Sequence, residues 1–304
     1  MRHVISVHDL SVEAINDVLN RAEGMLATAR GEAVNDCLNG KVLGSIFFEP
    51  STRTRLSFET AMNRLGGGVV GFAGTEATSV VKGETLADTI RMVSGYADAI
   101  VLRHPREGAA KLATEFSDVP IINAGDGAGQ HPTQTLLDLF TIRQEMGRLE
   151  GLNISLVGDL RYGRTVHSLA FALSKFGNTI NLVSPEGLEM PDEVVEHLEE
   201  SGQFGTACHT PEEVISSTDI LYVTRIQKER FPDPVEYKKV AGKYLIDPDL
   251  VSQGPENMIV MHPLPRINEI TPEVDVMPQA KYFVQAFNGV PVRMALLSMV
   301  IGGA

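Results

Sequence analysis

The chain has 304 residues, of which 43% are hydrophobic and 21% are charged, a composition typical of an ordered globular protein large enough for two domains. Its formal net charge of −13 disfavours binding to nucleic acid or to anionic lipid, because like charges repel. A small anion would therefore have to be bound by a local cluster of Arg, Lys and backbone N–H groups.

Cysteine and histidine usage predicts neither a disulfide framework nor a metal site. Cys37 and Cys208 lie far apart and form no CxxC pattern, which is typical of reduced thiols in a cytoplasmic protein. The eight histidines show no paired-ligand spacing, so no metal is expected. The N-terminus lacks the apolar core of a signal peptide, and no run approaches 18 apolar residues, so we expect no membrane span and a cytoplasmic location.

The first part of the chain alternates between helical and strand-like segments. Ser11 is a residue type that caps helices, and apolar positions after it recur with helical spacing as far as Leu26. A short apolar run at 42–48 is typical of a buried strand. Further expected strands cover 69–72, 99–102 and 119–123, and the expected helices cover about 53–65, 85–96 and 107–116.

The same alternation returns in the second half. The expected strands are 154–157, 180–183, 220–223 and 258–261, and the clearest helix is 164–176. Strands that alternate with helices predict an α/β fold with two domains, each a parallel sheet flanked by helices.

An amphipathic segment separates the two series of strands. Pro132 suits the first turn of a helix, and apolar positions continue to residue 147. We therefore expect a first domain at 1–131, a linking helix at 132–148 and a second domain at 149–288. A closing helix at 289–301 is expected to pack back, so that residues 289–304 complete the first domain.

The stretch FEPSTRTR is the most informative in the chain, because it lies between a strand and a helix. The N–H groups of a first helical turn are unpaired, and such a terminus with basic residues is suited to an anion. Arginine can grip a phosphate with two hydrogen bonds. A capped helix with exposed arginines is the competing interpretation. The hydroxyls and guanidiniums belong to Ser51, Thr52, Arg53, Thr54 and Arg55.

Other basic residues also fall at the ends of expected strands. Arg103 and Arg225 each follow one, where open parallel sheets bind ligands. Arg164 opens a helix after GDLRYG, a near miss for a P-loop, although a helix dipole disfavours an arginine in the first turn. Lys82 lies on a polar loop, where it could meet an anion or only solvent.

Two further segments carry polar groups suited to a carbonyl substrate. His131 can donate a hydrogen bond to an oxygen that becomes negative, and Gln134 offers a donor and an acceptor. A helix-capping histidine is the alternative. The segment HPLPR, at 262–266, is stiffened by prolines, so its carbonyl groups could accept from an amine or simply form a rigid turn.

Several of these motifs together resemble the aspartate and ornithine carbamoyltransferase family. STRTR after FEP resembles the family's phosphate-binding signature, and HPTQ resembles its HPxQ motif. HPLPR is similar to the aspartate branch, because the ornithine branch usually has HCLP and an SMG motif, and neither is present. The resemblance runs from the first expected helix to the last, with motifs in at least six places.

The resemblance implies a role for each matching residue. It implies catalytic roles for Arg53, Thr54, Arg103 and His131, and an active site in the cleft between the domains. Thr78 or Ser79, together with Lys82, would reach into a neighbouring subunit's site. Carbamoyl phosphate would be bound by Ser51, Thr52, Arg53, Thr54, Arg103, His131, Gln134, Leu264 and Pro265, and aspartate by Lys82, Arg164, Arg225 and Gln227.

The resemblance also implies the reaction and the assembly. The carbamoyl group of carbamoyl phosphate would pass to L-aspartate, giving N-carbamoyl-L-aspartate and phosphate, an early step of de novo pyrimidine biosynthesis. No cofactor is expected. Shared active sites imply a homotrimer, to which regulatory chains bind in some members of the family.

Three other functions agree less well with these residues. A cationic acceptor such as ornithine would favour carboxylates over Lys82, Arg164 and Arg225. A silent binding or regulatory paralogue would be expected to lose a phosphate-site arginine or His131, and all are present. A Rossmann dehydrogenase is excluded because no GxGxxG follows any expected strand.

Overall fold

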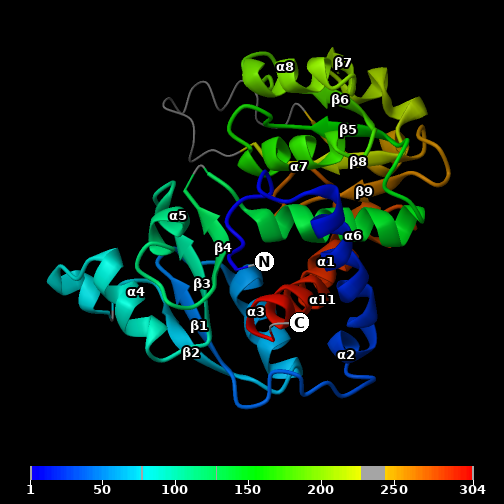
Figure 1. Ribbon diagram of the computed structural model, residues 1–304. Coiled ribbons are helices and arrows are strands. Elements are labelled where there is room, and N and C mark those ends of the chain that lie inside the picture. Colours follow the sequence, from blue (N-terminus) through cyan, green and yellow to red (C-terminus); the bar gives the residue numbers. More distant parts are fainter. Residues whose placement is uncertain (1, 77, 128, 227–243, 303–304) are drawn as a thin grey trace. The chain divides into compact units, whose positions relative to one another are not determined.

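The computed structural model describes residues 2–76, 78–127, 129–226 and 244–302. The chain divides into two compact units, and each is considered by itself. Unit 1 comprises Met1–Phe140 with Phe287–Ala304, and unit 2 comprises Thr141–Ala286. Unit 1 is therefore discontinuous in sequence, and the end of the chain returns to it (Figure 1).

Unit 1 contains a four-stranded sheet in the order β2-β1-β3-β4, and every neighbouring pair is parallel. The central strand β1 is buried along most of its length, whereas the edge strand β2 is largely exposed. The strands are β1 (Val42–Phe47), β2 (Gly68–Ala73), β3 (Ala99–His104) and β4 (Ile121–Asp126). The helices are α1 (Val12–Gly24), α2 (Leu26–Arg30), α3 (Thr52–Arg64), η1 (Ser79–Lys82), α4 (Leu86–Ser94), α5 (Ala109–Ala113) and the first part of α6 (Pro132–Met146).

Unit 2 contains a five-stranded sheet in the order β7-β6-β5-β8-β9, again with every neighbouring pair parallel. Its strands are β5 (Asn153–Val157), β6 (Thr179–Val183), β7 (Phe204–Cys208), β8 (Ile220–Val223) and β9 (Ile259–Met261). Its helices include α7 (Arg164–Ser174), α8 (Asp192–Glu200), η2 (Pro211–Glu213), η3 (Ile215–Ser217), α10 (Pro248–Val251) and η5 (Pro272–Val276). The expected α/β class with two parallel sheets is confirmed.

Local chemistry explains where the first elements begin. The Ser11 side chain accepts a hydrogen bond from the Ala14 N–H at 3.2 Å, so it caps α1 as expected. The apolar face of α1 is buried through Ile15, Val18 and Leu19. The helix expected to run on to Leu26 instead ends at Gly24, and α2 follows it.

The structure contains elements that the sequence analysis did not predict, and one predicted helix begins at a different residue. Strand β7 and helix α8 were missed, because β7 is mostly exposed and α8 buries only Leu198, so neither has a strong apolar pattern. The closing helix α11 (Tyr282–Ile301) begins seven residues before the expected Gly289. Pro291 lies inside it, a position where proline usually disrupts a helix, and this made an earlier start hard to predict.

Helix α11 is long and apolar enough to cross a membrane by length and composition alone. However, 72% of its 18-residue apolar window is buried inside the protein. Burial on that scale is what a core helix of a globular protein shows, since such a helix is apolar around most of its circumference.

Gly158 fixes the close approach of two strand ends in unit 2. It follows β5 with φ of +122°, and a Cβ placed on it would lie 2.2 Å from the Thr224 carbonyl oxygen. We expect Gly158→Ala to lower the free energy of unfolding of unit 2 by about 2–4 kcal/mol, because both the backbone conformation and the contact become unfavourable. The measurement is the urea unfolding midpoint.

The matched control for this substitution is Gly24→Ala. A Cβ on Gly24, at the end of α1, would have no heavy atom within 4 Å. Alanine favours helix there, so stability should stay the same or rise slightly. Equal unfolding midpoints for the two variants would contradict the role given to Gly158.

Candidate functional site

In unit 1, three connections lie at the carboxyl edge of the sheet and carry most of the predicted phosphate-site residues. The first runs from β1 into α3. Ser51 is the N-cap of α3 in an extended conformation, and its side chain makes no capping hydrogen bond. Thr54 is buried, whereas Thr52 and Arg53 are exposed. The first-turn N–H groups and these side chains therefore share one helix terminus, as an anion site requires.

The second arginine of the motif is used within the protein. Arg55 Nε donates to Glu59 Oε1 at 2.6 Å, one turn further along α3. The Ser45 hydroxyl of β1 donates to the same carboxylate oxygen at 3.2 Å. Glu59 thus joins Arg55 to strand β1 through Ser45, and Arg53 stays the predicted ligand of this motif.

Arg103 lies near the end of β3 and is held from two sides. Its Nη1 donates to the Ala124 carbonyl oxygen at 3.1 Å, and its Nη2 lies 3.1 Å from Glu49 Oε2. The side chain is only 14% exposed, and this burial lowers the pKa of Arg103 while the Glu49 carboxylate acts against that shift. Sequence reasoning did not predict that Glu49 contacts Arg103, although Glu49 lies inside the FEPSTRTR motif.

The third connection joins β4 to α6 and carries His131 and Gln134. His131 is buried, and its Nδ1 lies 3.4 Å from the Thr133 hydroxyl. Gln134 Nε2 donates to Asp138 Oδ1 at 2.9 Å. This assigns the Gln134 amide: its nitrogen is turned to Asp138, so its carbonyl oxygen is the group left to accept from a ligand.

A buried arginine from α11 supports this connection. Arg293 Nη2 donates to the Thr133 hydroxyl at 3.4 Å, and the guanidinium lies over the Phe58 ring at 5.0 Å from its centroid. Burial lowers the pKa of Arg293 to about 9, and the buried Asp138 carboxylate acts against that shift. The group is still charged at neutral pH, so a buried cation on α11 acts on a buried anion on α6, the helix that follows His131.

The predicted cross-subunit loop forms a short 3₁₀ helix in unit 1. The Thr78 hydroxyl donates to the Thr75 carbonyl oxygen at 2.8 Å and accepts from the Val80 N–H at 3.4 Å, so it caps η1. Ser79 and Lys82 are exposed. The choice between Thr78 and Ser79 as the contacting residue therefore stays open.

In unit 2, the two predicted aspartate-binding arginines follow neighbouring strands. Arg164 is the first residue of α7, which comes after β5, and Arg225 follows β8. Strands β5 and β8 pair in parallel, so both arginines lie toward the same edge of the sheet. Gln227 lies outside the described residues.

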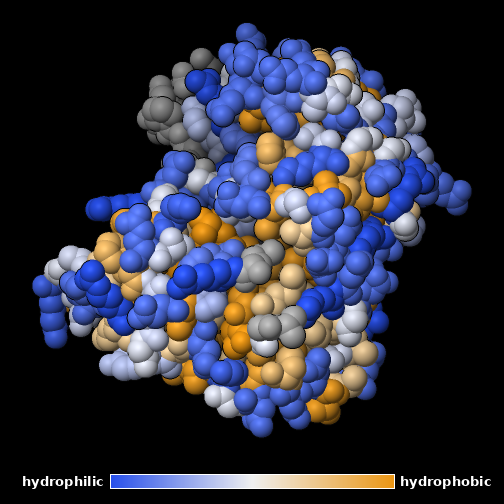
Figure 2. Space-filling view, in the orientation of Figure 1, coloured by the Kyte–Doolittle hydropathy of each residue, from blue (hydrophilic) through white to orange (hydrophobic). Residues whose placement is uncertain are grey.

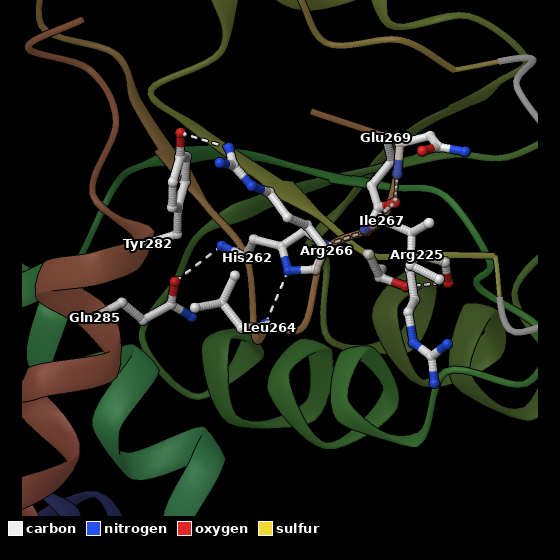
Figure 3. A network of polar contacts seen from close by, with 10 residues as sticks. Arg225, His262, Leu264, Arg266, Ile267, Glu269, Tyr282 and Gln285 are labelled. Carbon is white, nitrogen blue, oxygen red and sulfur yellow. Dashed lines mark hydrogen bonds and ion pairs between the residues drawn. The ribbon is translucent and has the colours of Figure 1, made fainter. Parts of the chain in front are cut away.

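The HPLPR loop follows β9 and is held by several hydrogen bonds (Figure 3). Leu264 has φ of +53°, and the Leu264–Pro265 peptide bond is cis. The Leu264 N–H donates to His262 Nδ1 at 2.8 Å, and His262 Nε2 lies 2.7 Å from Glu269 Oε1. The loop is therefore held by side chains of its own sequence.

Arg266 ends the HPLPR motif but is bonded within the protein. It forms a two-pronged ion pair with Asp275, and its Nη1 donates to the Tyr282 hydroxyl at 3.2 Å. The hydrogen bonds to Asp275 raise the pKa of Arg266. Its charge is thus engaged by a carboxylate within unit 2.

Two other features of the described residues do not belong to this set. No group of three or more His, Cys, Asp and Glu side chains that could hold a metal ion occurs among the residues described. A pocket in unit 2 near Glu186, His209 and Tyr244 contains none of the predicted site residues.

The chain is a parallel α/β protein with two units. Arginines and helix N-termini lie at the carboxyl edges of its sheets, an arrangement typical of proteins that bind anionic substrates. Two family descriptions match the chain: "Aspartate/ornithine carbamoyltransferase, carbamoyl-P binding domain" over residues 2–144, and "Asp/Orn binding domain" of the same enzymes over residues 150–300. The chain belongs to the aspartate/ornithine carbamoyltransferase family.

Individual relatives agree over nearly the whole length. The aspartate carbamoyltransferase catalytic subunit of Archaeoglobus fulgidus is 60% identical over 301 residues, which cover 99% of each chain. The catalytic subunit of M. jannaschii aspartate transcarbamoylase is 54% identical, with a TM-score of 0.93 over 99% of this chain and 98% of that one. The Trypanosoma cruzi enzyme in complex with carbamoyl phosphate is 42% identical, with a TM-score of 0.92 over 99% and 96%.

The buried charges of Asp138 on α6 and Arg293 on α11 give a stability prediction. We expect Asp138→Asn to lower the free energy of unfolding of unit 1 by about 3–5 kcal/mol, because the Arg293 guanidinium would lose its carboxylate while remaining buried. Urea unfolding measured at neutral pH gives the value.

Asp88→Asn is the matched control for this prediction. Asp88 pairs with Arg91 at 3.5 Å on α4, where both side chains are about 60% exposed. An exposed pair of this kind contributes at most about 1 kcal/mol. If Asp138→Asn and Asp88→Asn lower the free energy of unfolding equally, the prediction that the buried Asp138 stabilises unit 1 more than an exposed carboxylate is wrong.

Proposed function

We propose that this chain transfers the carbamoyl group of carbamoyl phosphate to the amino group of L-aspartate. The products are N-carbamoyl-L-aspartate and phosphate, in an early step of de novo pyrimidine biosynthesis. The observation that carries the proposal is the STRTR motif at the N-terminus of α3, in a chain that belongs to the carbamoyltransferase family. The relatives named as aspartate carbamoyltransferase catalytic subunits support aspartate as the acceptor.

The phosphate group would be bound at the start of α3. Ser51, Thr52 and Thr54 supply hydroxyls, the first turn supplies N–H groups, and Arg53 supplies a guanidinium. Each charge-assisted hydrogen bond contributes roughly 1.5–3 kcal/mol. Because the transferred phosphate leaves as an anion, this cluster would stabilise the departing group as well as bind the substrate.

The carbamoyl group would be oriented by residues from β3, α6 and the HPLPR loop. Arg103, His131 and Thr54 would donate toward its carbonyl oxygen. The Gln134 carbonyl oxygen would accept from its NH₂ group, which agrees with the Gln134 amide nitrogen being turned to Asp138. The backbone of Leu264 and Pro265 would position the carbamoyl group and the incoming amine.

Aspartate would be bound through its two carboxylates. Arg164, Arg225 and Lys82 offer positive charge, and Gln227 is proposed to join them. An acceptor with a second cationic group, such as ornithine, would be repelled by the same three residues. This distribution of charge favours aspartate within a family that uses either amino acid.

The reaction then follows from positioning and charge. The aspartate amine attacks the carbamoyl carbon, and a C–N bond forms while the carbonyl oxygen becomes an oxyanion. The oxyanion returns to a carbonyl as the C–O bond to phosphate breaks, and the departing phosphate takes up the proton that the nitrogen loses. The substrate supplies the nucleophile, so the protein's contribution is orientation, for which effective molarities on the order of 10⁵–10⁸ M are known, and stabilisation of negative charge.

The domain roles and the assembly are also part of the proposal. Residues 1–131, with 289–304, would bind carbamoyl phosphate, and 149–288 would bind aspartate, with 132–148 linking them. The functional form would be a cytoplasmic homotrimer in which Thr78 and Lys82 serve a neighbour's site. Apolar surface over α3 and α11, including the exposed Leu56, supports an interface between chains (Figure 2). Regulatory chains are a further possible partner.

The test compares Arg53→Ala with Arg55→Ala in the purified chain. With carbamoyl phosphate and L-aspartate, the Arg53 variant should lose about 10²–10³-fold in kcat/KM, because a guanidinium at the leaving phosphate is gone. Arg55 is paired with Glu59, so its variant should keep most of the activity and lose mainly stability. Carbamoyl-aspartate formation is measured directly.

Parallel reactions with L-ornithine complete the test. Turnover with ornithine alone would move the acceptor assignment to the other branch and remove the roles given to Arg164 and Arg225. Turnover with neither acceptor would refute transfer by the chain alone. Equal losses in the two arginine variants would contradict the distinction between Arg53 and Arg55.

A further inference from the structure

His262 is buried and holds the HPLPR loop through hydrogen bonds of its ring. The side chain is 1% exposed, and both ring nitrogens have partners in the loop itself. The backbone on either side is also anchored, because the His262 N–H donates to Gln285 Oε1 at 2.8 Å. A histidine so enclosed is unsuited to proton exchange with a substrate, so any role in the reaction must act through its neighbours (Figure 3).

The hydrogen bonds assign the ring tautomer. A backbone N–H can only donate, so the 2.8 Å contact from Leu264 requires His262 Nδ1 to be an unprotonated acceptor. The proton must then lie on Nε2, where it is donated to Glu269 Oε1 at 2.7 Å. Glu269 therefore selects the tautomer that Leu264 needs, as a carboxylate does for other functional histidines.

The charge state agrees with this assignment. Burial lowers the pKa of His262, and the nearby positive charges of Arg266 and Arg225 act in the same direction, whereas Glu269 opposes them. A neutral ring keeps Nδ1 available as an acceptor. A second proton on the ring would break the bond to Leu264 and place a buried cation in the loop.

Leu264 needs such an anchor. Among the described residues it is the one non-glycine residue with positive φ, at +53°. A leucine in the left-handed region costs roughly 1–2 kcal/mol, so other contacts must hold it there. Glu269 extends the anchor, because its Oε2 accepts from the N–H groups of Ile267 and Asn268, both at 3.0 Å.

We propose that His262 is a positioning residue for carbamoyl transfer. Its Nδ1, in the tautomer selected by Glu269, fixes the Leu264 N–H and thereby aims the backbone of Leu264 and Pro265 at the carbamoyl group and the amine. The inference rests on the proposed function in the roles given to that backbone. His262 and Glu269, neither of which was a predicted site residue, would thus act together to position Leu264.

The test uses two substitutions that each keep one of the two ring contacts. In His262→Asn, the side-chain oxygen lies near the position of Nδ1 and can still accept from Leu264, but it cannot reach Glu269. In His262→Gln, the longer amide reaches the position of Nε2 and Glu269, and the acceptor for Leu264 is lost. Both replace a buried ring with a smaller polar group, so a purely structural role predicts similar effects.

We expect the Gln variant to lose roughly 10–100-fold in kcat with L-aspartate and carbamoyl phosphate, because small displacements of a positioning group cost that much. The Asn variant should recover most of this loss, although both should show similarly lowered thermal unfolding midpoints. Inhibition by inorganic phosphate should be unchanged in both, since its proposed site lies at α3 in the other unit.

Equal kcat values for the Asn and Gln variants, or a larger loss in Asn, would overturn the inference even if the wild-type chain transfers carbamoyl groups. Absence of transfer by the wild-type chain would instead remove the proposed function on which it rests. If neither His262 variant folds, Glu269→Gln is decisive. Its amide can donate to Nε2 and release the tautomer, so kcat should fall, and an unchanged kcat would refute the proposal.

Discussion

Every strand pair in both sheets is parallel, and the positions of the candidate residues depend on this constraint. Parallel strands end at a common edge, so residues distant in sequence are delivered to one side of each sheet. In unit 1 this places the start of α3, the end of β3 and the start of α6 together. In unit 2 it does the same for the residues that follow β5, β8 and β9. The sequence between these points forms the helices that cover the sheets.

An acidic chain that gathers anions must keep its arginines from being neutralised by its own carboxylates. The structure shows two outcomes. Arg55 and Arg266 are engaged by Glu59 and Asp275, and each fixes a local piece of structure. Arg103 lies 3.1 Å from Glu49 and also donates to a backbone carbonyl, while its burial lowers its pKa.

Sequence reasoning predicted the strands of unit 1 and strands β5, β6, β8 and β9 of unit 2 to within a few residues, because short apolar runs in a parallel sheet are distinctive. It missed β7 and α8, which are too exposed to leave an apolar pattern. For the site, the motifs supplied the residues proposed to meet the ligands. They did not supply Asp138 and Arg293, since Arg293 and its partner Thr133 are 160 residues apart and only the fold brings them together. Glu269 lies close to His262 in sequence, yet nothing in its residue type shows that it selects a tautomer.

The discontinuity of unit 1 has a consequence for the order in which a newly made chain can fold. A ribosome synthesises the helix that carries Arg293 only after all of unit 2. Until then, the first part of unit 1 contains Asp138, at a position that becomes fully buried, without the Arg293 guanidinium that acts on it in the folded protein. Unit 1 therefore stays incomplete while unit 2 and helix α11 are translated. The final twenty or so residues, which contain none of the motif positions, thus decide when the motif residues acquire their supporting structure.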